Sequence, residues 1–223
     1  AAEAISGTMP PARALRLRAL LLERERVANH LGDLGYLGND VALSFGLMQF
    51  MRLKEDWIRL NARLFGHRLL MDRIVPGGVA IDLDDAGRGE ILDQCDVIGR
   101  EVRQLKAIYD EHAGLQDRFL TTGRVTPQLA KRLGVIGLAG RASAQWWDLR
   151  YNHPCEPYDE LKPRIITERN GDVAARALVR FGEIIESIRL IHKLLADLPH
   201  GAIRKDVHSE PEREGFGWIE GWR

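Results

Sequence analysis

The feature that most constrains the fold is a long apolar stripe near residue 180. Its side chains recur at alternating intervals of four and three positions: Ala177, Phe181, Ile184, Ile188, Ile191, Leu195 and Leu198. This spacing places them on one face of an α-helix, and Asp172 precedes them as a capping residue. Because such a helix must bury its apolar face, the stripe requires packing partners elsewhere in the chain.

The remaining apolar patterns also favour helices. They predict helices over about 10–33, 39–67, 84–112 and 126–133, the last beginning with a capping Thr followed by Pro. Strand-like alternation is nearly absent, and the turn signal near residue 77 leaves room for at most a small strand element. We therefore expect an all-α fold, a bundle of three long helices plus shorter helices, in a single domain over 1–223.

Asp40 lies at the junction between the first two predicted helices. Gly32, Gly35 and Gly38 precede it and are expected to loosen the chain there. Asn39 or Asp40 would then cap the second helix. A second role is also open, because a partly desolvated carboxylate has a raised pKa and suits proton relay.

The charge balance argues against partners that are bound through bulk electrostatics. The chain has 32 Lys and Arg against 32 Asp and Glu, so its formal net charge is zero, whereas nucleic acids attract strongly basic chains. The longest uncharged stretch, residues 41–51, is too short to cross a bilayer as a helix. No signal peptide is visible. We expect a globular chain with no transmembrane segment and no nucleic-acid partner.

The cysteines argue against a metal site within this chain. Cys95 and Cys155 form no CxxC pair, and the seven histidines form neither HxxxH nor HExxH. Two distant thiols cannot supply the several thiolates that a soft, redox-active metal needs. Cys95 lies on an apolar helical stripe and is expected to be a core thiol. For Cys155, in a proline-rich loop, we expect a structural or incidental role.

Three sets of residues carry a family resemblance. The first is LLERERVANHL at 21–31, with ND at 39–40 and QFMRLKE at 49–55. The second is the glycine-pair turn RIVPGGV at 73–79. The third comprises TGR at 122–124, RAS at 141–143, DLR at 148–150, HP at 153–154 and GDV at 171–173, followed by Arg180 and Glu183. In order and spacing, the three sets resemble the large-subunit family shared by energy-converting nickel–iron (NiFe) hydrogenases and respiratory complex I.

Within that family the chain is most similar to the large subunit of membrane-associated, group 4 hydrogenases of the formate hydrogenlyase and hydrogenase 4 type. Their Ni–Fe centre is held by four cysteines, as one CxxC before the helical core and one near the C-terminus, and this chain has neither. The resemblance therefore implies a central fragment of a longer large subunit. The fragment itself would be inactive and hold no cofactor or metal, while its full-length parent would interconvert H2 with protons plus electrons.

The resemblance also gives candidate catalytic roles to three residues, as proton relays or as lining of the metal site. Asp40 matches an acid beside the metal site of hydrogenases and beside the quinone head-group site of complex I. Arg223 matches the arginine over the metal pair, in the tail GFGWIEGWR at 215–223, and Glu220 is its candidate partner. The alternatives are a solvated terminal arginine and an exposed glutamate.

Three further residues are candidate binding or site-lining residues. His30 ends the first predicted helix, where a structural role at the helix dipole or in a polar pocket is the alternative. Arg141 and Asp148, together with Arg150, flank Trp146 and Trp147, for which a helix with aromatic anchors is the alternative to a subunit contact or a site-lining role.

Three functions stay open. The first is the hydrogenase subunit, with electrons from an iron–sulfur small subunit. The second is the quinone-site subunit of NADH-quinone oxidoreductase, where quinone takes the place of the Ni–Fe centre. The third is a metal-free scaffold that holds the cluster subunit against a membrane arm. The resemblance implies iron–sulfur and membrane-arm partner subunits and a peripheral position on the cytoplasmic side of the inner membrane. Expressed alone, the fragment is expected to self-associate through exposed apolar surfaces.

Overall fold

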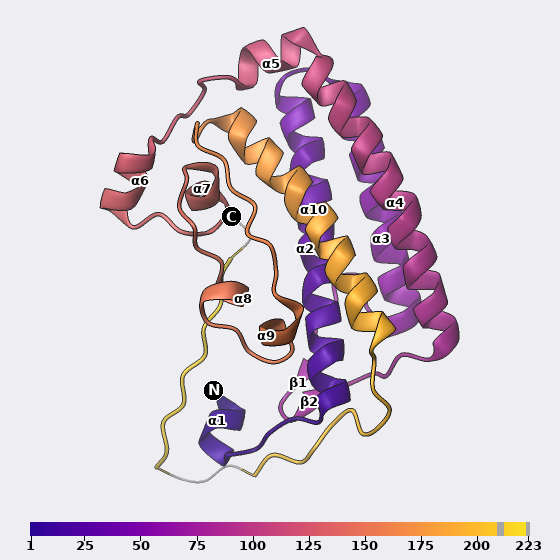
Figure 1. Cartoon of the computed structure of the whole chain (residues 1–223). Coiled ribbons are helices and arrows are strands. Elements are labelled where there is room, and N and C mark those ends of the chain that lie inside the picture. The colour runs from indigo at the N-terminus through magenta and orange to yellow at the C-terminus, as the bar shows by residue number, and fades with distance from the viewer. Residues whose placement is uncertain (209–211, 222–223) are drawn as a thin grey trace.

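Long helices form the body of the computed structural model, which describes residues 1–208 and 212–221 (Figure 1). Within this described part, the helices longer than twenty residues are α2 (Ala12–Asp40), α3 (Ser44–Phe65), α4 (Asp85–Glu111) and α10 (Val173–Ala196). The expected all-α fold is confirmed, with four long helices where the sequence patterns predict three.

The shorter elements lie at both ends and along one side of this bundle, with α5 at the top and α1 and the strands at the bottom of the view (Figure 1). They are α1 (Ala2–Ser6), β1 (Ile74–Val75), β2 (Gly78–Val79), α5 (Ala113–Phe119), α6 (Pro127–Leu133), α7 (Gly137–Ala142), α8 (Leu149–Asn152) and α9 (Tyr158–Leu161). The two strands form an antiparallel hairpin in which Val75 pairs with Gly78. Gly77 turns the hairpin at a φ of 83°, a left-handed conformation that favours glycine.

Helix α2 is the central element of the bundle. It packs against both α3 and α10, and Figure 1 shows it running behind α10 with α3 and α4 at its side. Apolar residues such as Leu17, Leu20 and Leu31 are at most 1% exposed. Because the helix is covered on several sides, charged side chains of α2 are buried as well, and these contribute to the site described below.

The apolar stripe of α10 packs as its spacing predicts. Phe181, Ile184 and Ile191 are buried, and Phe181 joins Phe50 of α3 and Tyr109 of α4 in an aromatic cluster. The three ring centroids lie 5.4 to 5.9 Å apart, a range typical of favourable aromatic pairs. The cluster holds α3, α4 and α10 together beside the C-terminal part of α2.

The expected break after residue 33 is wrong, because α2 continues to Asp40. Gly32, Gly35 and Gly38 are not linker residues; they lie on one face of the helix and allow close packing. A Cβ at Gly35 would lie 3.2 Å from the Cβ of Phe50, and a Cβ at Gly38 would clash with the Tyr109 hydroxyl. Tertiary contacts thus override the low helix propensity of glycine.

Asp40 is therefore the last residue of α2 and not the cap of the next helix. Helix α3 starts at Ser44. The residue at its N-cap position is Leu43, whose side chain accepts no hydrogen bond from the first turn of the helix. The predicted caps Thr126 and Asp172 accept hydrogen bonds from backbone N–H groups in the first turns of α6 and α10, and Asp84, at the predicted start of 84–112, does the same for α4. Among the described residues, none of the helices combines the length and apolar character needed to span a membrane.

The glycine face predicts an unusual response to Gly38→Ala. In an ordinary helix this change stabilises by about 1 kcal/mol. Here the new methyl group displaces Tyr109, whose hydroxyl donates to the carbonyl of Leu34 at 3.0 Å, so we expect a loss of about 1–3 kcal/mol. Urea unfolding followed by circular dichroism measures it. Gly89→Ala, in an open part of α4, is the matched control, and equal effects of the two changes would contradict the packing role.

Candidate functional site

Charged side chains are buried together beside α2. We call them the buried charge network, whose members are Glu23, Arg26, His30, Arg141, Asp148, Arg150 and Glu183. Each is at most 7% exposed. Buried ions are costly unless they are paired and hydrogen-bonded, so the contacts of each member matter.

Glu183 of α10 is the first centre of the network. Its Oε2 accepts from Arg26 at 3.1 Å and lies 2.6 Å from His30 Nε2, and its Oε1 accepts from Arg141 Nε at 2.6 Å. Burial by itself raises the pKa of Glu183. The hydrogen bond with His30 and the guanidinium charges of Arg141 and Arg26 outweigh it and hold the pKa well below the usual range. Glu183 is therefore a carboxylate that links α2, α7 and α10.

Glu23 of α2 is the second centre. Arg150 Nη1 donates to both its oxygens at 2.9 and 3.0 Å, and the hydroxyls of Tyr158 and Ser187 each donate at 2.6 Å. Burial raises the pKa of Glu23, but the charges of Arg150 and Arg26 lower it by more. The pKa of Glu23 is therefore below its usual value. Asp148 accepts from Arg150 through both carboxylate oxygens at 3.0 and 2.7 Å and also caps α8.

The chain tail closes the network through Glu220. Its Oε1 accepts from Arg141 Nη1 at 2.6 Å and its Oε2 accepts from the backbone N–H of Leu149 at 3.0 Å. Arg141 thus bridges two carboxylates, Glu183 in the bundle and Glu220 in the tail. Three contacts, His30 with Glu183, Glu183 with Arg141, and Arg141 with Glu220, form a continuous polar path. The path runs from the buried face of α2 to the tail.

Counted over its described members and Glu220, the network is unbalanced by one charge. Glu23, Asp148, Glu183 and Glu220 are four carboxylates, and Arg26, Arg141 and Arg150 are three guanidinium groups. Burial lowers the pKa of His30 even though Glu183 opposes the shift, so the ring is neutral at pH 7. Within this set the carboxylates outnumber the guanidinium groups by one, and the Arg180 guanidinium, which is paired with Asp33, also interacts with Glu183.

A cavity of about 340 Å³ gives solvent access to this network. Arg26, Asp148, Arg150 and Glu220 line one part of its wall, together with apolar residues of α2 and the tail. Its volume is within the range of small-molecule sites. Acid–base side chains and an accessible cavity therefore meet at the tail.

The structure brings together four of the six predicted residues. His30, Arg141 and Glu220 join through Glu183, and Asp148 joins through Arg150. The helix-dipole interpretation of His30 is wrong, because α2 extends ten residues beyond it; its place in a polar pocket is confirmed.

The other two candidates lie elsewhere. Asp40 is exposed, at the far end of α2, about 15 Å along the helix from His30 at the usual rise per residue. Its expected desolvation is wrong for this chain, because its side chain faces solvent at the end of the helix. Arg223 lies outside the described residues.

Sequence reasoning missed Glu23, Arg26, Tyr158 and Glu183 as members of a site, whereas it weighed Arg150 together with Arg141 and Asp148. One signal for Glu183 exists. Val179, Leu190 and Leu194 form a second buried stripe on α10, and Glu183 and Ser187 continue it as polar residues. No local signal marks Tyr158. The proline-rich segment around it favours a surface loop, but the Tyr158 side chain is only 3% exposed.

The thiols do not fit a nickel–iron group. Cys95 is fully buried in the hydrophobic core, where burial raises the pKa of its thiol to about 12, and Cys155 lies on the loop before α9. A soft metal pair needs several converging thiolates, which these two residues do not supply. In the described part of the chain, no group of three or more His, Cys, Asp or Glu side chains could hold a metal ion.

Because Glu183 contacts three buried side chains, we expect Glu183→Gln to have a large effect on stability. The change leaves Arg26 and Arg141 buried beside a neutral amide, so we expect the free energy of unfolding to fall by about 3–5 kcal/mol. Glu90→Gln removes a carboxylate from a surface pair with Arg63 and should cost less than about 1 kcal/mol. Denaturant unfolding of both variants measures the difference. Similar values would show that the network contributes no more than a surface pair.

His30 predicts a pH dependence of stability. Its folded pKa is below the unfolded value of 6.5, so the unfolded chain takes up a proton first as the pH falls. The folded state thus loses stability from about pH 6.5 downward, by at most about 1.4 kcal/mol per pH unit. The unfolding free energy of His30→Gln should be flatter between pH 7.5 and 5.5. A wild-type chain that gains stability relative to this variant as the pH falls would indicate a raised pKa instead.

The comparisons with known proteins agree on one family. Residues 40–215 match the family model described as "Respiratory-chain NADH dehydrogenase, 49 Kd subunit". A subunit of the NADH-quinone oxidoreductase of Sinorhizobium medicae is 31% identical over 207 residues, which cover 93% of this chain and 51% of the relative. The carbon monoxide-induced hydrogenase of Rhodospirillum rubrum is 31% identical over 202 residues, which cover 90% of this chain and 56% of the relative.

A solved structure has the same fold. It is the membrane-bound sulfane sulfur reductase, an archaeal respiratory membrane complex, which matches with a TM-score of 0.85 and 26% sequence identity over 92% of this chain and 56% of that one. The chain spans about half the length of the relatives it matches. By the family model, the relatives and the fold together, it belongs to the family of the 49 kDa subunit of respiratory-chain NADH dehydrogenase.

Proposed function

We propose that this chain is the central, helical part of the large subunit of a membrane-associated hydrogenase, whose parent interconverts H2 with protons plus electrons. The observation that carries the proposal is the polar path from His30 through Glu183 and Arg141 to Glu220, which ends at an accessible cavity. Hydrogen chemistry at a buried centre needs groups that take up and release protons. His30 and Glu220, at the two ends of the path, are residue types that do so, whereas Glu183 and Arg141 between them stay charged and position the tail. The similarity to a carbon monoxide-induced hydrogenase supports the same class.

In this proposal the chain's residues position the tail and handle protons. Glu220 is the carboxylate of the path that lines the cavity, and Arg141 holds it in place while Arg141 stays bound to Glu183. Asp40 is a second relay candidate and Arg223 the residue over the metal pair, both by family resemblance. The metal ligands would belong to parts of the parent outside this chain. An iron–sulfur small subunit and membrane-arm subunits would be its partners.

The alternative is the quinone-site subunit of an NADH-quinone oxidoreductase. The family model over residues 40–215 and the similarity to the Sinorhizobium medicae oxidoreductase favour it specifically. His30 or Glu220 of the same path would then supply protons to the quinone as it is reduced. A metal-free scaffold would use the bundle for assembly alone, and it predicts no effect of Glu220 on turnover.

The parent protein distinguishes these functions. We expect its reading frame to hold two CxxC pairs, one on each side of this region, and the purified complex to contain nickel and to reduce a dye with H2. A parent without the cysteine pairs and nickel that reduces quinone from NADH would overturn the hydrogenase proposal in favour of the alternative. A parent with neither activity would favour the scaffold.

Glu220→Gln in the intact complex tests the proton path. The amide keeps an acceptor for Arg141 but carries no titratable proton, so we expect turnover to fall by about 10²-fold with unchanged subunit content and, in a hydrogenase, unchanged nickel. Glu214→Gln, at an exposed position of the same tail, is the control. The pH profile separates the roles, because loss of a relay removes a titration step whereas loss of an anchor lowers activity equally at all pH values.

A further inference from the structure

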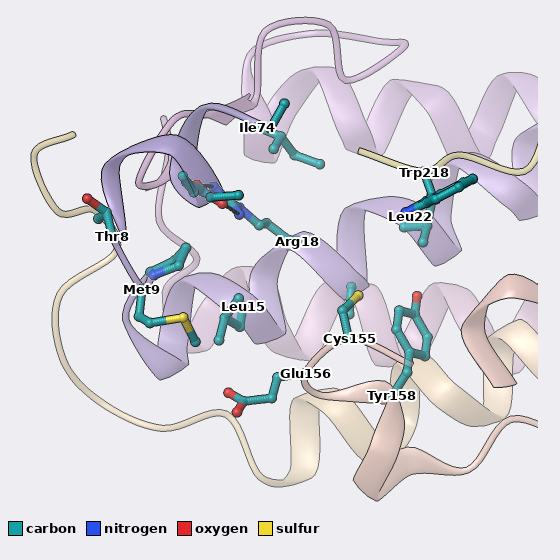
Figure 2. Close-up of a pocket in the computed structure, with 16 residues that line it drawn as sticks. Thr8, Met9, Leu15, Arg18, Leu22, Ile74, Cys155, Glu156, Tyr158 and Trp218 are labelled. Carbon is teal, nitrogen blue, oxygen red and sulfur yellow. Dashed lines mark hydrogen bonds and ion pairs between the residues drawn. The ribbon is translucent and has the colours of Figure 1, made fainter. Parts of the chain in front are cut away.

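A larger cavity lies between the N-terminal segment, the start of α2 and the loop before α9. Its volume is about 820 Å³, within the range of small-molecule sites. Figure 2 shows the residues that line it. Apolar side chains dominate its wall: Met9, Leu15, Ala19, Leu22, Ile74 and Trp218. The function proposed above makes no use of this cavity.

The main polar groups at its wall are already bound to the protein. The Arg18 guanidinium donates to the Glu3 carboxylate at 2.5 and 3.0 Å and to the carbonyls of Val75 and Gly78 at 2.8 and 3.0 Å. The hydroxyl of Tyr158 donates to Glu23 at 2.6 Å. A charged ligand would have to break these bonds and bury its own charge, so the cavity favours an uncharged, apolar occupant.

The rim of the cavity is apolar as well. Met9 is 66% exposed, Ile74 is 52% exposed and Trp218 is 84% exposed. Exposed apolar side chains grouped around a hollow mark a binding site more than an ordinary surface, and methionine adapts to irregular apolar shapes. The occupant therefore contacts hydrophobic groups both inside the cavity and at its mouth.

The position of this cavity next to the smaller one favours a chain-like occupant. The large cavity shares Leu22, Cys155, Tyr158 and Trp218 with the smaller cavity beside the buried charge network, so the two adjoin. A linear molecule can extend along both, whereas a compact ring system would fill one of them. We propose that this cavity binds the linear acyl chain of a single-chain lipid, whose head group stays in solvent at the rim.

The two cysteines allow a direct test. Cys155 lies at the meeting point of the two cavities, and Figure 2 shows its sulfur pointing into the space between Arg18 and Tyr158. Cys95 is fully buried in the core, so a maleimide should modify Cys155 alone in the folded chain. The measurement is the rate of this modification with dodecanoyl lysophosphatidylcholine below its micelle concentration.

We expect the lysolipid to slow the modification of Cys155 at least fivefold, and native mass spectrometry to find one lysolipid per chain. Glycerophosphocholine has the same head group without the acyl chain and should give no protection. Free dodecanoate should protect as well, because the chain carries the binding. Protection by glycerophosphocholine, or no protection by the two acyl compounds, would overturn the proposal.

Filling the cavity should abolish the protection. Ala19→Phe places a ring in its wall, and Ala4→Trp fills it from the exposed rim, where the change threatens folding less. Ala86→Trp, at an exposed site in α4 away from the cavity, is the matched control. Circular dichroism confirms folding of each variant. Undiminished protection in a folded Ala4→Trp chain would place the lipid elsewhere and refute the proposal.

Discussion

One buried carboxylate, Glu183, holds three distant segments of this chain together. Arg26 and His30 reach it from α2 and Arg141 from α7, while α10 carries it. Because removing a carboxylate from water costs several kcal/mol, the fold keeps this charge only where all three partners converge. The position of α7, and with it the contact of Arg141 with the tail, depends on that convergence.

One face of α10 packs in the hydrophobic core, and the other face carries polar side chains of the site. Its apolar stripe joins Phe50 and Tyr109 in the aromatic cluster that fixes the bundle. Its other face presents Glu183 and Ser187 to the buried charges of α2. Helix α10 thereby connects the hydrophobic core with the polar path.

Local patterns predicted the helices well where local forces decide. The predicted ranges 84–112 and 172–198 agree with α4 and α10 to within two residues at each end, because capping carboxylates start them and a regular stripe continues them. They failed at Gly32, Gly35 and Gly38. Glycine is a poor helix former, and only the closeness of Lys54, Phe50 and Tyr109 makes it the residue that fits at these three positions.

The sequence by itself determined that this chain is helical, where most helices begin, and which family it resembles. Only the tertiary structure decided which residues form the site. His30 and Glu183 are 153 positions apart and Glu23 and Tyr158 are 135 apart, so no local pattern reports their contacts. Backbone propensity and apolar spacing act over a few residues, whereas a buried charge is stabilised by whichever partners the complete fold brings to it.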